Sequence, residues 1–404
     1  MTTDQSAVAD ESWNRHHRVS AAARCLYAGT GAAVLPASRR YASGQSSLEI
    51  KDGIWHLRVR ESSYRDNGYV IGRLLAEAEY PAVRFFGLKR VRWIVNILYA
   101  VTRRNFALIR IPERYLEELR GYAEGSKLPY LTLYFMNFVF DILKKYGFHC
   151  SSVAISEPQA TLVGRNTDLI PWIAKAALKW LPPVVLDISV PGKLRYVHVT
   201  PGLFLGVLSG FNERGIAMMS HQIAATKEKS VPGTLATPLL QRMILEEATD
   251  MAHAKSVIYA NPVQRCISDL VTSSAECQSC VFEITPELVK EIPANGNTLC
   301  CATHFEDLEL SSLKRYETTV SQQRLSLMNT LVAGLRAIPE CLIEMLRNYD
   351  NGLSHRQSGS SPTNEGTYQS MVFDITGRRV FVSDGTELPV SLTGNYREIV
   401  LHDE

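Results

Sequence analysis

The chain has 404 residues, and at about 100 to 200 residues per domain this length allows two or three domains or one large unit. Apolar residues make up 46% and charged residues 21%, which excludes disorder over the whole chain and fibrous classes. Lys and Arg number 43 against 41 Asp and Glu, and a net charge of +2 is too small to indicate a nucleic-acid partner.

The number of cysteines and the length of the apolar runs predict the cellular compartment of the protein. Eight cysteines are too few for a disulfide scaffold, which favours reduced thiols and a cytoplasmic location. No uncharged apolar run reaches the roughly 18 residues of a membrane-spanning helix. The signal-like stretch from Cys25 to Ala37 follows a leader with acidic residues, whereas an export signal begins with a short basic segment. No zinc, HExxH or phosphate-loop spacing is present, so we expect no metal and no cofactor.

The amino-acid pattern of the N-terminal part changes near residue 53. Residues 1–48 are rich in Ala, Ser and Arg and poor in large apolar side chains, which predicts a loose tail. Alternation then predicts a strand at 54–59, and apolar spacing predicts helices at 67–80 and 131–143. Residues 49–149 are therefore expected to be mainly helical.

The stretch between Arg84 and Arg110 holds seven Lys or Arg and no acid, around an apolar run from Trp93 to Val101. Basic flanks with aromatic residues suit a helix that lies on an anionic lipid surface, which predicts a possible peripheral membrane contact. The alternative is an ordinary helix whose apolar face packs on the core and whose basic rim is solvated. The sequence favours this second interpretation slightly and leaves both open.

The second half predicts an α+β domain. Alternating residues predict a strand hairpin over 151–163, and strands are also expected at 194–199, 203–208, 216–220, 280–285, 298–302, 370–374 and 379–383. Helices are expected at 238–247, 253–259 and 322–347. Strands at both ends with helices between them indicate a layered α+β domain rather than parallel βαβ winding.

One of the predicted strand hairpins contains candidate catalytic residues. Cys150 comes directly before its first strand, and Arg165 and Asp168 end the return strand, so the three are neighbours although 15 and 18 residues apart. A guanidinium beside a thiol stabilises the thiolate and lowers the thiol pKa. The alternative, which the pattern alone favours, is that a lone cysteine on a strand is an inert small apolar residue.

Three motifs extend this segment: Gly121-Tyr122-Ala123-Glu124-Gly125, Cys150-Ser151-Ser152-Val153-Ala154 and Gly164-Arg165-Asn166-Thr167-Asp168. With flanking matches at 67–74, 206–215 and 373–385, the chain resembles acid ceramidase and the N-acylethanolamine-hydrolysing acid amidases. It is similar, more distantly, to penicillin acyltransferases and bile-salt hydrolases, all N-terminal-nucleophile (Ntn) hydrolases. The resemblance implies an αββα four-layer sandwich, with 49–149 as a helical prosegment and 150–404 as the catalytic domain.

The resemblance also implies a mechanism. The chain would cut itself between His149 and Cys150, and the two resulting chains would stay associated. The freed α-amine, with a pKa of about 7.7 to 8.0, can then act as the base for its own thiol. Asp168 would hold the α-ammonium and Arg165 the thiolate. The implied reaction is hydrolysis of a linear amide in an N-acyl substrate, such as a fatty acyl amide or a ceramide-like lipid.

Further site residues follow from the same resemblance. Thr303 stands where the family has an oxyanion-binding Asn, a departure because a hydroxyl reaches less far than an amide. Arg315 matches a family Arg that braces the site, although a surface helix Arg is the alternative. His221 stands where relatives have an Asn.

The expected acyl pocket includes Trp172, Ile173, Leu178, Trp180 and Leu181, and His221 is also expected to bind substrate. Two alternatives to an amidase remain at this point. One is an acyltransferase that uses the same Cys150 with an amine acceptor, and the other is a catalytically silent lipid-binding protein.

Overall fold

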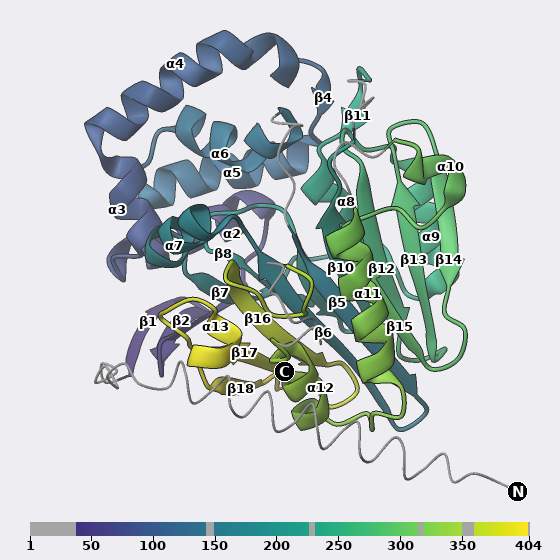
Figure 1. Cartoon of the computed structure of the whole chain (residues 1–404). Coiled ribbons are helices and arrows are strands. Elements are labelled where there is room, and N and C mark those ends of the chain that lie inside the picture. The colour runs from purple at the N-terminus through teal and green to yellow at the C-terminus, as the bar shows by residue number, and fades with distance from the viewer. Residues whose placement is uncertain (1–37, 143–148, 226–230, 314–317, 350–358, 403–404) are drawn as a thin grey trace, which may run out of the picture.

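The computed structural model describes residues 38–142, 149–225, 231–313, 318–349 and 359–402. Two β-sheets pack against each other, and helices cover the outer face of each sheet (Figure 1). In the part of the chain that is described, no helix is both long enough and apolar enough to cross a bilayer.

The larger sheet has ten strands in the order β1-β2-β3-β7-β8-β9-β10-β12-β13-β14. These strands are β1 (Arg39–Ser43), β2 (Ser46–Lys51), β3 (Ile54–Arg60), β7 (Pro183–Ser189), β8 (Tyr196–Pro201), β9 (Ser209–Asn212), β10 (Ile216–Gln222), β12 (Ile267–Ser273), β13 (Gln278–Ile284) and β14 (Val289–Pro293). All neighbours in it are antiparallel except β3 and β7, which run parallel.

The smaller sheet has six antiparallel strands in the order β15-β5-β6-β16-β17-β18. They are β5 (Ser151–Glu157), β6 (Ala160–Asp168), β15 (Thr298–Ala302), β16 (Thr367–Asp374), β17 (Arg379–Ser383) and β18 (Tyr396–Val400). A separate parallel pair joins β4 (Ile109–Arg110) to β11 (Thr234–Leu235).

The helices fall into two groups and a few short pieces. Those over the larger sheet are α2 (Tyr64–Glu77), α3 (Pro81–Gly87), α4 (Lys89–Phe106), α5 (Glu113–Ser126), α6 (Tyr130–Ile142), α8 (Thr237–Glu247) and α9 (Met251–Ala260). Over the smaller sheet lie α11 (Thr319–Val332) and α12 (Pro339–Leu346). The others are α7 (Pro171–Trp180), α10 (Leu308–Ser311) and α13 (Val390–Thr393).

Alternation along the strands produces these layers. In β7, Val184 and Leu186 pack into the helix-side core, while Val185 between them packs against the other sheet. In β5, Val153 packs under α11 and α12, while Ala154 faces the larger sheet. A strand with apolar residues on both faces is covered on both sides. The expected αββα sandwich is therefore confirmed.

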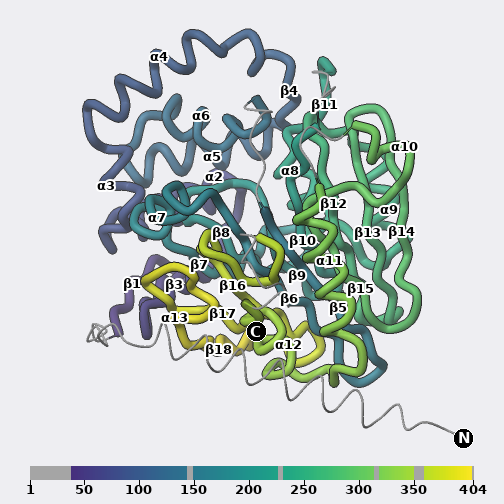
Figure 2. Tube along the Cα trace, viewed as in Figure 1, coloured from purple at the N-terminus to yellow at the C-terminus, as the bar shows by residue number. Residues whose placement is uncertain are grey.

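The N-terminal segment is more than a helical cover. Residues 38–48, assigned to the tail from their composition, include β1 and the first half of β2, a strand in which Leu48 and Ile50 point inward and are buried. A short strand of this kind is hidden when composition is averaged over a long polar stretch. Strand β3 pairs with β7, so this segment supplies one edge of the larger sheet (Figure 2). The rest of the predicted tail, 1–37, lies outside the described residues.

Helices α2 and α5 pack through glycines. A Cβ atom built on Gly68 would lie 2.0 Å from the Glu118 carbonyl oxygen, and one on Gly121 would lie 2.1 Å from the Arg65 carbonyl oxygen. Gly72 and Gly125 make the same kind of approach one turn further on. Only glycine allows the two backbones to come this close.

Two predicted elements differ in the structure. The helix expected at 322–347 is two helices, because Gly334 takes a φ of 78° and Pro339 begins the second helix. The strand expected at 203–208 is a loop. Its backbone is bonded instead to side chains, with Leu205 N donating to Asn137 Oδ1 and Leu205 O accepting from Arg242.

Candidate active site

Cys150 lies directly before β5 and is fully buried. Strand β5 forms a hairpin with β6, in which Ser152 is opposite Arg165. The backbone N–H of His149 donates to the Asp168 carbonyl at 3.0 Å, which extends the pairing to the peptide bond before Cys150. The hairpin therefore brings Cys150, Arg165 and Asp168 together at one end of the smaller sheet.

Arg165 holds the thiol. Its Nη2 donates to Cys150 Sγ at 3.2 Å, its Nη1 to the Leu208 carbonyl at 2.7 Å and its Nε to Thr167 Oγ1 at 3.1 Å. The side chain is fully buried, so these bonds fix the guanidinium against the sulfur. Burial raises the pKa of the Cys150 thiol, and the positive charge of Arg165 opposes that rise. In this structure Cys150 is therefore a thiol at neutral pH.

Asp168 is held from a distant part of the chain. Asn364 Nδ2 donates to Asp168 Oδ2 at 2.7 Å, and the Thr367 hydroxyl donates to Asp168 Oδ1 at 2.6 Å. Burial raises the pKa of Asp168 to about 6, although Arg324 and these hydrogen bonds lower it. No local pattern places Asn364 and Thr367 at the site, since Asn364 lies in the loop before β16 and Thr367 is the first residue of that strand.

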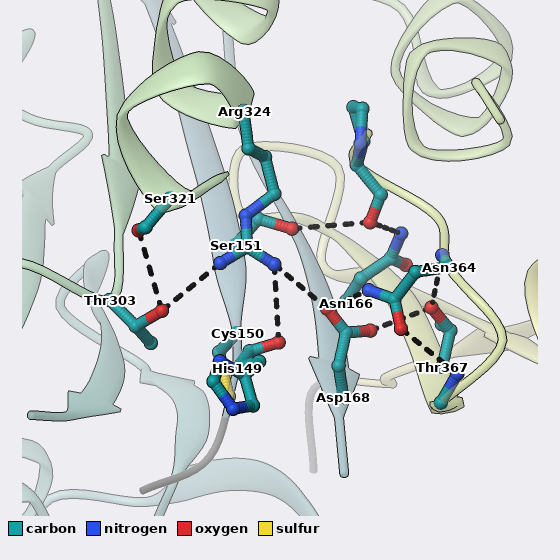
Figure 3. A network of polar contacts seen from close by, with 12 residues as sticks. His149, Cys150, Ser151, Asn166, Asp168, Thr303, Ser321, Arg324, Asn364 and Thr367 are labelled. Carbon is teal, nitrogen blue, oxygen red and sulfur yellow. Dashed lines mark hydrogen bonds and ion pairs between the residues drawn. The ribbon is translucent and has the colours of Figure 1, made fainter. Parts of the chain in front are cut away.

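Arg324, on α11, is the residue that joins the parts of the site (Figure 3). Its Nη1 lies 3.2 Å from Asp168 Oδ2 and 3.5 Å from the carbonyl oxygen of His149, and its Nη2 donates to Thr303 Oγ1 at 3.0 Å. The guanidinium is fully buried. One cation therefore contacts the acid, the Thr303 hydroxyl and the peptide bond that precedes Cys150.

Sequence reasoning missed Arg324 and named Arg315 as the bracing arginine. Arg315 lies outside the described residues. A signal for Arg324 was available, because it stands seven residues before Leu331 and four before Met328, on the apolar stripe of α11. A charged residue on the buried face of a helix requires a partner, and here the partner is Asp168.

Thr303 follows β15 directly, where sequence reasoning placed the oxyanion donor. Its hydroxyl oxygen accepts from Arg324 and lies 3.5 Å from Ser321 Oγ. Ser321 in turn contacts His304 Nδ1 at 2.8 Å. Both contacts of Thr303 are thus with residues of α11, Arg324 and Ser321. The residue next to the His149 carbonyl is Arg324.

His221 ends β10 and is buried beside Cys301. Its Nδ1 donates to the Ser268 carbonyl at 2.9 Å, and burial lowers its pKa well below the ordinary value. Since Nδ1 carries the proton in the neutral ring, Nε2 is an acceptor and does not supply an oxyanion donor. Among the described residues, no group of three or more His, Cys, Asp or Glu side chains is arranged to hold a metal ion.

A cavity of about 700 Å³ lies between α7 and the loop after β17. Its walls include Ile54, Leu178, Pro182 and Tyr368. Burial chiefly, and the nearby Cys150, raise the pKa of Tyr368.

Of the residues expected to line an acyl pocket, Leu178 lies in the wall of this cavity, and Trp172, Ile173 and Trp180 belong to the same helix, α7. Trp172 is 72% exposed, three residues before Lys175 of the cavity rim. Ile173 is half-buried, and Trp180 packs on Phe85 with ring centroids 5.0 Å apart. Their part in substrate binding stays a prediction.

Comparison with known proteins gives the following matches. The family model described as acyl-coenzyme A:6-aminopenicillanic acid acyl-transferase matches residues 155–386, which is more than half of the chain. Arg165, Asp168, Thr303 and Arg324 lie within this match, and Cys150 lies five residues before it. No curated protein matches the chain by sequence.

Two solved structures that match this chain are the following. The N-acylethanolamine-hydrolyzing acid amidase ortholog of Caenorhabditis elegans is 16% identical over 63% of this chain and 100% of its own, with a TM-score of 0.39. A mutant of the conjugated bile acid hydrolase of Clostridium perfringens is 11% identical over 63% of this chain and 97% of its own, with a TM-score of 0.40.

The match of the family model is what identifies the chain. The layered fold and the cysteine-led hairpin agree with it. This protein belongs to the acyl-coenzyme A:6-aminopenicillanic acid acyl-transferase family of N-terminal-nucleophile cysteine enzymes.

Proposed function

We propose that this chain is a self-processing N-terminal cysteine amidase, which hydrolyses the linear amide bond of an N-acyl substrate through a thioester on Cys150. A fatty acyl amide or a ceramide-like lipid is the substrate class. The observation that carries the proposal is the surround of the His149–Cys150 peptide bond, where Arg165 contacts the sulfur and Arg324 contacts the carbonyl oxygen.

Self-cleavage would begin with attack of Cys150 Sγ on the His149 carbonyl carbon. The C–S bond forms, the C–N bond breaks, and the thiol proton passes to the departing nitrogen, which becomes the α-amine of Cys150. Water then attacks the thioester, releasing the His149 carboxylate and restoring the thiol. The cysteine so exposed is both nucleophile and, through its amine, base.

Arg324 would supply the charge that stabilises the oxyanion on His149 oxygen. A fixed donor at such an oxygen contributes about 2.7 to 4 kcal/mol to the transition state. Thr303 would then be a positioning residue, because its hydroxyl accepts from Nη2 of Arg324 and so orients Nη1 toward the carbonyl. In this proposal the missing family Asn is replaced by an arginine held by a threonine.

Turnover would use the same groups. The α-amine of Cys150 takes the thiol proton, and the sulfur attacks the substrate carbonyl. The α-ammonium then gives this proton to the amine of the substrate, which leaves, and water hydrolyses the thioester. Asp168 would accept from the α-ammonium, since its carboxylate is already oriented by Asn364 and Thr367. The apolar part of the cavity wall, Ile54, Leu178 and Pro182, favours an acyl chain.

The two chains produced by cleavage would stay together. Arg242 of α8 donates to Glu118 of α5 at 2.5 Å and to Glu246 at 2.7 Å, and all three side chains are fully buried. Tyr115 of α5 also donates to Glu246 at 2.7 Å. This buried cluster and the β3–β7 pairing both cross from the prosegment to the catalytic chain.

An acyltransferase is the second candidate, favoured by the description of the matching family. It would form the same thioester on Cys150 and pass the acyl group to an amine instead of water. Product analysis with an N-acyl substrate and a competing amine separates the two, because a transferase gives a new amide and an amidase gives the free acid. A catalytically silent lipid-binding form would remain a single uncut chain.

Intact mass of the purified protein tests the proposal. Wild-type protein should give a chain that begins at Cys150, whereas Cys150→Ala should remain at 45.1 kDa. Cys341→Ser, on the partly exposed face of α12, is the matched control and should cut like wild type. Cleavage of Cys150→Ala at the same bond would disprove self-processing by this thiol.

A further inference from the structure

Helix α4 has two apolar faces, and only one of them is packed. Val95 and Phe106 are buried against the core of the helix layer, and Val91 and Tyr99 lie half-buried on the same side. These positions are four or more residues apart, as one side of a helix requires. Figure 1 shows α4 at the outer edge of the molecule, beyond α6, so its other side faces outward.

The outward side carries large apolar residues. Their exposed fractions lie between 43% and 78%. They form two rows along the helix in which neighbours are four residues apart, one with Trp93, Ile97 and Val101 and the other with Ile94 and Leu98. Leu88, directly before the helix, is also exposed. We call these five helical residues the α4 stripe. Within the part of the chain that the structure describes, no other residues cover this apolar surface, which is of a kind that marks an interaction site.

Basic residues surround the α4 stripe. Lys89, Arg90, Arg92, Arg103 and Arg104 are exposed, and none of them makes an ion pair with any residue that the structure describes. No acidic residue occurs between Arg84 and Arg110. The helix therefore presents apolar side chains and uncompensated positive charge to the same partner.

We propose that α4 docks the protein on an anionic lipid bilayer, lying in the plane of the interface with the α4 stripe in the acyl region. An amphipathic helix with Trp and Leu on one face and Lys or Arg around it binds in this way. The five basic residues would face anionic headgroups.

The other occupants fit less well. A second copy of the chain would bring two uncompensated basic surfaces together, which repels. A span across the bilayer is excluded by the five charges in α4 and by the packing of its inner face. The exposure of the apolar run from Trp93 to Val101, most of which is outside the core, supports the first of the two interpretations of this stretch.

Vesicle sedimentation tests the proposal on the full chain, with Cys150→Ala protein so that binding is read apart from turnover. Vesicles of phosphatidylcholine alone are compared with equimolar phosphatidylcholine and phosphatidylglycerol. We expect binding to the anionic vesicles only. Binding should weaken between about 0.1 M and about 1 M salt, where the Debye length falls from about 10 Å to about 3 Å.

Two further variants separate the contribution of the apolar residues to vesicle binding from that of the basic residues. Ile97→Glu should lower partitioning at least about tenfold, and Arg103→Gln with Arg104→Gln should lower it by about fivefold per residue. Leu308→Glu, at a position on α10 that is 90% exposed, is the matched control and should bind like the parent. All these positions are on the surface, so equal thermal melting of the variants is expected.

Three results would overturn the proposal. They are no binding of the parent to anionic vesicles at low salt, an equal loss in Leu308→Glu, or a dimer in solution that Ile97→Glu converts to monomer. The last result would assign the α4 stripe to contact between copies of the chain.

Discussion

The Arg324 guanidinium donates to Thr303 Oγ1 at 3.0 Å and at the same time lies 3.5 Å from the carbonyl oxygen of His149. Among the described residues, the hydrogen bonds of the threonine hydroxyl are with Arg324 and Ser321, and the donor to that carbonyl is Arg324. The place of the hydroxyl in the site is behind the arginine. Loss of the hydroxyl is therefore expected to act through the orientation of Arg324.

Thr303→Ala should slow self-cleavage by about 10- to 100-fold, because a hydrogen bond to a charged group contributes about 1.5 to 3 kcal/mol. Thr303→Ser keeps the hydroxyl and should restore most of the rate. The measurement is the time course of the uncut chain on a denaturing gel after rapid purification. Equal rates for the Ala and Ser variants would contradict a positioning role for the hydroxyl.

Self-cleavage should fall as the pH drops through about 6. Burial raises the pKa of Asp168 to about 6, so the carboxylate is ionised above this pH and neutral below it. The neutral form no longer balances the charge of Arg324, and the guanidinium loses its fixed position. The measurement is the single-turnover cleavage rate between pH 5 and 8. This range extends about 1 to 2 pH units either side of the Asp168 pKa. Asp168→Asn should cut slowly at every pH and lack this dependence; a wild-type rate that is flat across the range would count against the assignment.

Gly121→Ala should destabilise the protein strongly. The added methyl group would lie 2.1 Å from the Arg65 carbonyl oxygen, so α2 and α5 must move apart. Overpacking of this kind costs about 1 to 3 kcal/mol, and a contact with backbone leads to the upper end. Gly87→Ala, at the end of α3 with open space around it, is the control and should be close to neutral. Urea unfolding midpoints of the two variants give the comparison.

Arg242→Met should destabilise the uncut chain by about 3 to 5 kcal/mol, because it leaves Glu118 buried without its cation and leaves Glu246 with only the longer pair to Arg114 at 3.9 Å. In cut protein it should also let the two chains separate on size exclusion in mild urea. Arg65→Met removes two pairs on the exposed side of α2, with Glu117 and Glu124, and should cost about 1 kcal/mol or less. Similar losses in the two variants would show that burial of the cluster is not what holds the chains.

The sequence by itself placed Cys150, Arg165 and Asp168 in one site because a hairpin is a local structure. Two strands joined by a short turn have few possible registers, so residues 15 and 18 positions apart become neighbours. Alternation likewise predicted β5, β6, β15, β16 and β17 of the smaller sheet, but only β3, β8, β10 and β13 of the ten strands in the larger sheet. The layered class followed from the order of the predicted strands and helices. These features depend on short-range geometry that sequence pattern expresses directly.

Tertiary structure alone decided which residues complete the site and which face of α4 is covered. Arg324, Asn364 and Thr367 reach Asp168 across 156, 196 and 199 residues, and no local pattern specifies contacts at such separations. In α4 the sequence shows apolar residues on two sides, and only the position of α6 settles that Val95 and Phe106 are packed while Trp93 and Val101 are exposed. The reason is physical: periodicity fixes which residues share a face, whereas the neighbour that buries a face is set by the fold of the whole chain.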